Sequence, residues 1–206
     1  VFAMTNKSKG VKGITAFLVE RDNPGISIGL PEDKMGMNGS ETCSVSFSDC
    51  VVPASAMLGK EGKGFNIAME TLDGGRLSCS ALALGIAQSA LDATIAYTKE
   101  RIQFGKPIAA NQGIQWVLVD MATRVDCARM LVYRAAAAKM AGLPYTRESA
   151  QAKLYAAEAA TYVTQKAVQL HGGMGYTKSY PVERLMREAK LTEIFEGTNE
   201  VQRMVI

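Results

Sequence analysis

The sequence predicts a mainly α-helical protein with a β part, in which a partial antiparallel β domain is followed by a four-helix bundle. Residues 1 to about 55 alternate apolar and polar side chains with the period of two that half-buried strands show. From about residue 65 onward, long alanine-rich segments repeat apolar residues at steps of three and four, which is typical of packed helices. We therefore place a domain boundary near residue 60, between residues 1–59 and 60–206.

The β part contains two strand-like segments, Ile14–Val19 and Ser44–Ser48. Turn-forming residues lie between them, at Asp22–Gly25 and Gly36–Gly39. So few strands cannot close a sandwich or a barrel alone. We therefore expect residues 1–59 to be the later part of a larger β domain.

The helical part is predicted to contain three long helices, a short fourth one and the start of another after residue 200. The predicted bounds are about Phe65–Lys99, Gln112–Met140, Arg147–Leu170 and Pro181–Leu191. The second helix carries an apolar stripe formed by Ile114, Leu118, Met121, Val125, Ala128, Val132 and Ala135. The third carries a similar stripe formed by Ala156, Ala159, Val163, Ala167 and Leu170. We interpret both stripes as bundle core.

Composition excludes several kinds of function. A net charge of +3 is too weak and too dispersed to argue for a nucleic-acid partner. A single histidine, His171, cannot build a His-rich metal site, and no metal is expected. We found no run of 18 apolar residues to span a membrane and expect no membrane partner. The four cysteines, Cys43, Cys50, Cys79 and Cys127, form no C-x-x-C pair, so we expect packed, reduced thiols, which suits a cytosolic protein.

Two glycine-containing segments break the local rules. Adjacent Gly74 and Gly75 inside a predicted helix cost about 1 kcal/mol each relative to alanine, so either the helix breaks there or a ligand lies beside Asp73 and Arg76. After the third helix, the glycines of residues 169–176 are typical of a helix C-cap followed by a turn. Their adjacent glycines also expose backbone amides that suit a pyrophosphate or a ring carbonyl. This segment is not G-x-G-x-x-G and follows no strand, which excludes a Rossmann site.

A third unusual segment is Phe195-Glu196-Gly197-Thr198. A carboxylate beside an aromatic ring in a short loop can be partly desolvated, and desolvation raises a carboxyl pKa toward values useful to a general base. A surface glutamate at a helix start would look the same, so this segment alone leaves both interpretations open.

Taken in order, these segments resemble the C-terminal half of an acyl-CoA dehydrogenase. The matching motifs are LGK-EGKGF, TLDGGR, ALGIAQ, ERIQFGKP, QLHGGMGY and IFEGTNEVQ, and the resemblance covers essentially the whole chain. GLPYT, AVQLHGGMGYTK and YPVER look most like the bacterial short-chain, butyryl-CoA type. The resemblance implies a longer protein with an N-terminal helical domain, a middle β domain and a C-terminal four-helix bundle around FAD.

The activity that the resemblance implies is FAD-dependent α,β-dehydrogenation of a short-chain acyl-CoA thioester to the trans-2-enoyl-CoA. Glu196 matches the base that abstracts the α-proton, while the β-hydride goes to flavin N5. Some members carry the base at the position that is Gly75 here, and glycine cannot be a base. The resemblance further implies an electron-transferring flavoprotein as acceptor and a homo-oligomer, a dimer of dimers. The expected location is the cytoplasm of a bacterium, or the mitochondrial matrix of a eukaryote.

The resemblance also assigns substrate and cofactor residues. Asp73, Gly74, Gly75 and Arg76 match the thioester channel, and Gly197 packs at the substrate. Residues matching contacts to a neighbouring subunit's FAD are Arg101, Gln103, Phe104, Gln112, Gln169, Leu170, His171, Gly172 and Gly173. Thr198, Asn199 and Glu200 match contacts to the flavin of the same subunit. His171 stands where many relatives have Phe, and we interpret it as turn packing.

Two alternatives stay open. One is an acyl-CoA oxidase-like flavoenzyme that reoxidises its flavin with oxygen. The other is a non-catalytic module that keeps the bundle for assembly. The joint presence of Glu196, Arg76 and Arg101 disfavours the second alternative.

Overall fold

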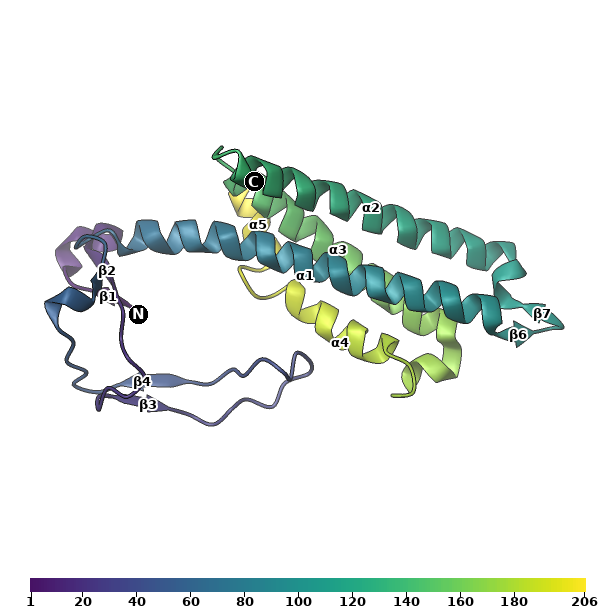
Figure 1. The fold of residues 1–206 in the computed structure, drawn as a ribbon, viewed down its shortest axis with the longest axis horizontal. Helices are drawn as coiled ribbons and strands as arrows, with labels where there is room; N and C mark the ends of the chain where they lie inside the picture. The colour runs from purple at the N-terminus through teal and green to yellow at the C-terminus, as the bar shows by residue number, and fades with distance from the viewer. The chain divides into compact units, whose positions relative to one another are not determined.

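A computed structural model describes all residues 1–206, which fall into two compact units, Val1–Leu72 and Asp73–Ile206. Long helices dominate, and the strands form small antiparallel sheets (Figure 1). This confirms the predicted class, a mainly α protein with a β part.

The first unit holds two small sheets. In one, β1 (Phe2–Met4), β2 (Ile14–Phe17) and β5 (Met57–Leu58) pair antiparallel with β2 in the centre. In the other, β3 (Ile26–Ile28) pairs with β4 (Val45–Phe47), so that Ile26 lies opposite Phe47. Short 3₁₀ turns, η1 (Lys7–Gly13) and η2 (Ala54–Ala56), precede β2 and β5. The two predicted strand segments are therefore present as the shorter β2 and β4.

The buried Thr15 fixes the segment that leads into the first long helix. Its hydroxyl accepts a hydrogen bond from the amide of Gly62 at 2.9 Å and shares another with the Thr5 hydroxyl at 2.9 Å. Gly64 lies directly against the Thr15 backbone, where an added Cβ would come within 2.7 Å of the Thr15 carbonyl carbon. Glycine at residue 64 therefore permits this close approach.

The first helix, α1 (Gly64–Glu100), continues without interruption through Gly74 and Gly75. Neither glycine has a positive φ, so both keep helical backbone geometry. The interpretation of this pair as a helix break is therefore wrong. What the two glycines provide instead is space beside the helix, as the site below shows.

The second unit is a helical bundle. Its other helices are α2 (Gln112–Met140), α3 (Thr146–His171), α4 (Val182–Thr192) and α5 (Asn199–Val205). The hairpin β6 (Ile102–Gln103) and β7 (Lys106–Pro107) with η3 (Ile108–Ala110) joins α1 to α2, and η4 (Gly172–Tyr176) follows α3. The predicted helix bounds agree within a few residues. Pro181 is the N-cap of α4, so this helix begins one residue later than predicted.

Helix α3 is the centre of the bundle and packs against α2, α4 and α5. Its core face consists largely of alanines, which allow close helix approach. In the predicted stripe of α2, five residues from Met121 to Ala135 are buried, while Ile114 and Leu118 are only half-buried. The α3 stripe is buried except for the half-buried Leu170. Both stripes are core, as predicted.

Helix α1 also differs from the expectation that no segment is apolar enough to span a membrane. It is 37 residues long and contains an 18-residue window with a mean hydropathy of 1.3, sufficient by length and composition alone. Half of that window is buried inside the structure. Core helices that are apolar on most sides give the same signal, so this is weak evidence for a membrane segment.

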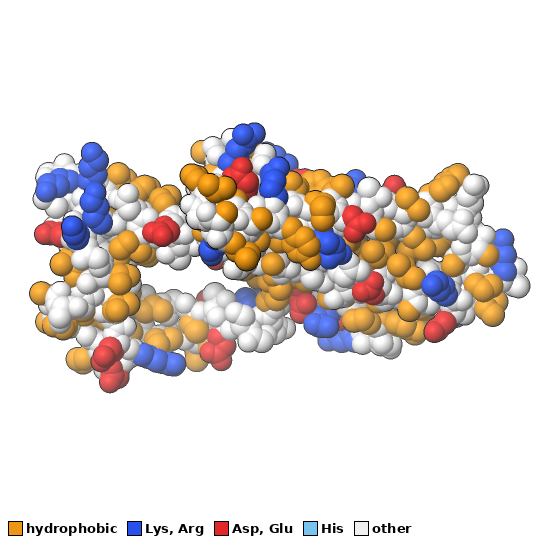
Figure 2. Space-filling model, turned by 45° about the horizontal axis from the view of Figure 1, so that its top comes forward, with side chains coloured by type: hydrophobic (Ala, Val, Ile, Leu, Met, Phe, Trp, Pro, Cys, Tyr) orange, Lys and Arg blue, Asp and Glu red, His pale blue; other side chains and the backbone are white.

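Surface charge is mixed. On the face drawn in Figure 2, Lys and Arg side chains are interspersed with Asp and Glu.

All four cysteines are free thiols: Cys79 is buried, Cys43 and Cys50 are half-buried, and Cys127 is exposed.

Candidate active site

The loop between α4 and α5 places Glu196 in an unusual backbone conformation. Glu196 has a φ of 56° and the following Gly197 a φ of 87°. Two consecutive left-handed residues turn the chain sharply, and this conformation is uncommon for a residue other than glycine. Thr198 then caps α5 by accepting a hydrogen bond from the amide of Val201 at 3.4 Å.

The carboxylate of Glu196 lies directly against Gly75 of α1. A Cβ added at Gly75 would lie 2.7 Å from the carboxyl carbon of Glu196 and 3.0 Å from its Oε1. A Cβ at Gly74 would meet only the Nζ of Lys139, at 3.7 Å, an ordinary contact. The absent side chain at Gly75 therefore creates the space that the carboxylate occupies.

A buried ion pair lies one residue further along α1. The guanidinium of Arg76, whose side chain is 7% exposed, donates to Asp73 at 2.8 Å. The second carboxylate oxygen of Asp73 accepts a hydrogen bond from the Thr146 hydroxyl. The Nε of Arg76 is buried without a partner. Because a paired guanidinium keeps its charge, Arg76 holds a fixed positive charge next to Gly75.

Two buried residues near Glu196 were missed in the sequence. Lys153 of α3 is fully buried, and its Nζ donates to the Asn199 side chain at 3.2 Å. Burial lowers the pKa of Lys153, against the opposite influence of Cys79, Glu193 and Glu200. The signal that could have revealed this lysine is its place on the alanine-rich core face of α3.

Cys79 of α1 is the second missed residue. Burial raises its pKa to about 11, opposed by the charge of Lys153 and reinforced by that of Glu196. The thiol therefore stays protonated at neutral pH and donates weakly to the Thr192 carbonyl at 3.8 Å. A protonated thiol cannot accept a proton from a substrate, so Cys79 does not compete with Glu196 as a base.

A second group of predicted residues lines a pocket of about 360 Å³ beside the turn after α3. The structure brings together seven of the residues predicted to contact a cofactor: Arg101, Gln103, Gln169, Leu170, His171, Gly172 and Gly173. Side chains added at Gly172 or Gly173 would meet nothing within 4 Å, so the backbone there is open to a ligand. Gly172 has a φ of 60° and ends α3 as its C-cap.

His171 lines this pocket and packs against two aromatic rings. Its ring stacks on Tyr97 with centroids 4.2 Å apart and meets Tyr180 edge-on at 5.2 Å. Its Nδ1 lies 2.7 Å from the Ala167 carbonyl, so Nδ1 carries the proton and donates it. Burial lowers the pKa of His171, opposed by this backbone hydrogen bond. The imidazole is thus a neutral packing group beneath the pocket.

The remaining predicted cofactor residues lie outside the pocket. Phe104 is 98% exposed, with a φ of 52° in the turn between β6 and β7. Gln112 is exposed as the first residue of α2. Asn199 is buried and its amide oxygen faces Lys153, whereas Glu200 is exposed at the start of α5. The Asn199 side chain is therefore already engaged within the protein.

The two groups of predicted residues lie far apart along α1. Gly75, beside Glu196, and Glu100, next to Arg101, are separated by roughly 38 Å at 1.5 Å per helical residue. One dinucleotide cannot reach from one group to the other. The arrangement suits two different bound molecules.

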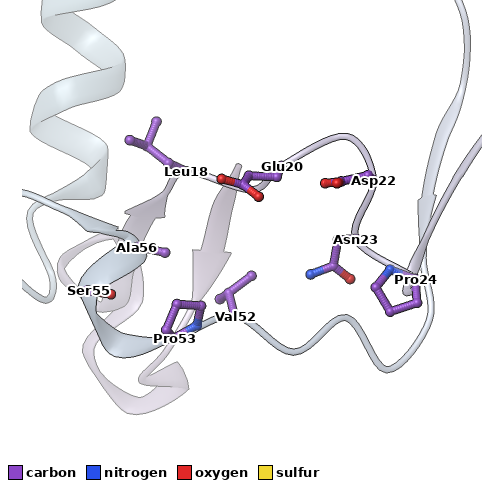
Figure 3. Close-up of a pocket in the computed structure, with 9 residues that line it drawn as sticks. All are labelled: Leu18, Glu20, Asp22, Asn23, Pro24, Val52, Pro53, Ser55 and Ala56. Atoms are coloured by element: carbon purple, nitrogen blue, oxygen red, sulfur yellow. The ribbon is translucent and has the colours of Figure 1, made fainter.

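The first unit contains a further pocket, of about 560 Å³, that the sequence did not indicate. Glu20 and Asp22 lie along one side of it and Val52 and Pro53 along the other (Figure 3). The Asn23 side chain donates to the Val51 carbonyl at 2.9 Å and so joins the two walls. None of the predicted site residues lines this pocket.

No group of three His, Cys, Asp or Glu side chains is arranged to hold a metal ion.

Known proteins resemble this chain closely. A family model described as acyl-CoA dehydrogenase, C-terminal domain, matches residues 62–206. Acryloyl-CoA reductase (NADH) of Anaerotignum propionicum is 56% identical, over 100% of this chain and 52% of that protein. The short-chain specific acyl-CoA dehydrogenase of Clostridium acetobutylicum is also 56% identical, over 100% of this chain and 54% of the relative. The butyryl-CoA dehydrogenase structure from Megasphaera elsdenii has a TM-score of 0.98 at 55% identity, covering 100% of this chain and 54% of the other. The chain spans about half the length of these relatives.

Proposed function

The chain belongs to the acyl-CoA dehydrogenase family, and on that premise we propose that the whole protein dehydrogenates a short-chain acyl-CoA thioester to the trans-2-enoyl-CoA. The observation that carries this proposal is the contact between the Glu196 carboxylate and Gly75. The contact gives the base a defined position beside the helix segment that resembles the family's thioester channel. The short-chain preference follows the names of two relatives that are 55–56% identical to this chain.

In the proposed reaction, the thioester carbonyl acidifies the α-carbon and Glu196 accepts the α-proton. A carboxylate can do this because its oxygens are free acceptors when ionised. The neighbouring groups favour this assignment, since the Cys79 thiol stays protonated and Gly75 offers no side chain. Arg76, neutralised in part by Asp73, contributes a fixed positive charge in the same segment of α1 as Gly75.

The residues of the pocket at the turn after α3 suit the cofactor FAD. Arg101 offers a permanently charged set of donors that matches a pyrophosphate, and the missing side chains at Gly172 and Gly173 leave room for it beside the turn. The amide of Gly172 already donates to the Gln169 carbonyl, so it is not one of the donors. When bound, FAD would supply the acceptor for the two electrons. Because Gly75, which Glu196 contacts, and Glu100, next to Arg101 of the pocket, lie roughly 38 Å apart along α1, we propose that the pocket holds the FAD of a neighbouring subunit. A homo-oligomer, as in a dimer of dimers, would then be required for a complete site.

A second candidate function is the reverse reaction. The acryloyl-CoA reductase of Anaerotignum propionicum is as similar to this chain as the dehydrogenase of Clostridium acetobutylicum. In that direction the protonated Glu196 would give its proton to the α-carbon of an enoyl-CoA, and the β-carbon would receive the hydride that bound, reduced FAD would supply. The same residue thus serves either direction.

The test uses the full-length protein that contains this chain, loaded with FAD. Mixing with butyryl-CoA without oxygen should bleach the flavin and give crotonyl-CoA in equal amount. Reoxidation of the flavin faster by an electron-transferring flavoprotein than by air would support a dehydrogenase over an oxidase. Absence of bleaching by short, medium and long acyl-CoA thioesters, together with no oxidation of the reduced enzyme by enoyl-CoA, would contradict both directions.

A further inference from the structure

The conformation of the loop that carries Glu196 needs a structural cause. Glu196 and Gly197 have consecutive left-handed φ values of 56° and 87°. The glycine adopts this conformation freely, but the glutamate does not. Because the left-handed conformation is unfavourable for a residue other than glycine, contacts that stabilise it help to keep the carboxylate beside Gly75.

A restraint comes from Gln202 of α5, the last residue of the motif IFEGTNEVQ, to which the resemblance assigned no role. Gln202 is fully buried. Its side-chain nitrogen donates to the main-chain carbonyls of Glu196 at 3.1 Å and of Gly197 at 2.8 Å. Both hydrogens of the amide are thereby used on the two left-handed residues. Only the nitrogen can face these carbonyls, since the amide oxygen in its place would repel both.

The packing leaves little freedom at this contact. A Cβ added at Gly197 would come within 2.8 Å of the Gln202 nitrogen and 3.3 Å of a Val201 methyl group. Helix α5 itself is anchored, because the amide of Asn199 donates to the Glu193 carbonyl at 3.0 Å and its side chain accepts from the buried Lys153. Gln202 therefore connects the loop to a fixed helix.

We propose that Gln202 is a positioning residue that holds Glu196 in the left-handed conformation from which its carboxylate reaches the space beside Gly75. This inference rests on the proposed function, because it assigns Gln202 a role through the catalytic base. Gln202 makes its contacts with main-chain atoms of the loop, and the acyl-CoA itself is not its partner. Its loss should therefore slow proton abstraction and leave substrate affinity unchanged.

The test compares Gln202→Met with wild type in the full-length, FAD-loaded protein. Methionine has nearly the same length but donates no hydrogen bond. We expect the rate constant for flavin reduction by butyryl-CoA to fall about tenfold to a hundredfold, as for a reacting group displaced by about 1 Å. The Kd for butyryl-CoA, measured from the concentration dependence of the same reaction, should stay within about threefold. Gln202→Glu, which places acceptors against the two carbonyls, should be slowed at least as much.

A matched control separates positioning from general damage. Thr164→Val removes another fully buried polar group, whose hydroxyl donates to the Ala160 carbonyl within α3 and does not touch the loop. It should reduce its flavin at the wild-type rate. The midpoint of thermal unfolding and the FAD content of each variant show that the compared proteins are folded and loaded.

A double variant tests whether Gln202 acts through Glu196. If Gln202 acts through Glu196, adding Gln202→Met to Glu196→Gln should not slow flavin reduction further. Reduction of Gln202→Met within about twofold of wild type, or a full additional loss in the double variant, would overturn the role of Gln202 while leaving the base in place. A wild-type rate of flavin reduction in Glu196→Gln alone would instead show that Glu196 is not the base, and the proposed role of Gln202 would be wrong as well.

Discussion

The Glu196 carboxylate fills the space that a side chain at residue 75 would occupy. A Cβ at Gly75 would lie only 2.7 Å from the carboxyl carbon, closer than real Cβ atoms come to a neighbour. The position of the Glu196 side chain thus depends on the absence of a side chain at residue 75, in a distant part of the sequence. The glycine in the helix and the glutamate in the loop form one structural feature.

Substitution of Gly75 should therefore disturb the base. Gly75→Ala should stabilise α1 locally by about 0.5–1 kcal/mol through helix propensity, yet displace the Glu196 carboxylate. We expect flavin reduction by butyryl-CoA to slow about tenfold to a hundredfold in stopped-flow measurements. Gly74→Ala is the matched control, since its Cβ would make only an ordinary contact at 3.7 Å, and should reduce at nearly the wild-type rate. Equal rates for the two variants would show that the contact does not constrain the carboxylate.

The same contact predicts how the base could be moved. A glutamate at residue 75 needs the space that the side chain of residue 196 now fills. Glu196→Gly combined with Gly75→Glu should therefore recover part of the flavin-reduction rate that Glu196→Gly alone loses. Gly75→Glu with Glu196→Gln should recover none, because both side chains compete for one space. Recovery in this second combination, measured in the same assay, would contradict the shared space.

Arg101 should affect cofactor retention and not the chemical step. Loss of one charge-assisted hydrogen bond costs about 1.5–3 kcal/mol, so Arg101→Ala should weaken FAD binding about tenfold to a hundredfold. Dilution of the full-length variant should release flavin, detected as a rise in free FAD fluorescence. Lys106→Ala is the control, because Lys106 lies on the hairpin that follows Arg101 but does not line the pocket. Arg101→Ala with unchanged FAD affinity would remove this residue from the cofactor site.

His171 should make stability depend on pH. Burial lowers its folded pKa below the ordinary value of 6.5, so below about pH 6.5 the unfolded chain binds a proton more readily than the folded one. The wild type should therefore lose stability as the pH falls through this range. His171→Phe keeps a ring stacked on Tyr97 but removes the titration, so its unfolding midpoint should fall less on acidification. Parallel pH profiles of the two proteins in thermal unfolding would refute this linkage.

The sequence predicted the fold class, the helix bounds and the family, because these depend on local patterns. The steps of three and four in α2 and α3 indicate the core faces directly, and most of those residues are buried. The motifs around Asp73, Gly172 and Glu196 carried the resemblance to the family, which the comparisons confirm. The roles assigned to individual site residues remain predictions.

Other features depend on contacts that no local pattern contains. The Gly74–Gly75 pair suggested a helix break equally well, and only the position of Glu196 explains why α1 continues through it. Lys153 stands among the alanines of the α3 core face, but only the packing of α3 against its neighbours shows that its charge is buried. Gln202 ends the motif IFEGTNEVQ, but the motif does not reveal its role, since its two partners are main-chain carbonyls.

The role of Glu196 is tested most directly by stopped-flow flavin reduction in full-length Glu196→Gln. Glutamine keeps the shape of the side chain and its hydrogen bonding, but its amide cannot accept the α-proton at neutral pH. Positioned general bases contribute about 10²–10⁴-fold, so the variant should bind FAD and butyryl-CoA normally while its flavin bleaches at least about a hundredfold more slowly without oxygen. Bleaching at close to the wild-type rate would show that Glu196 is not the base.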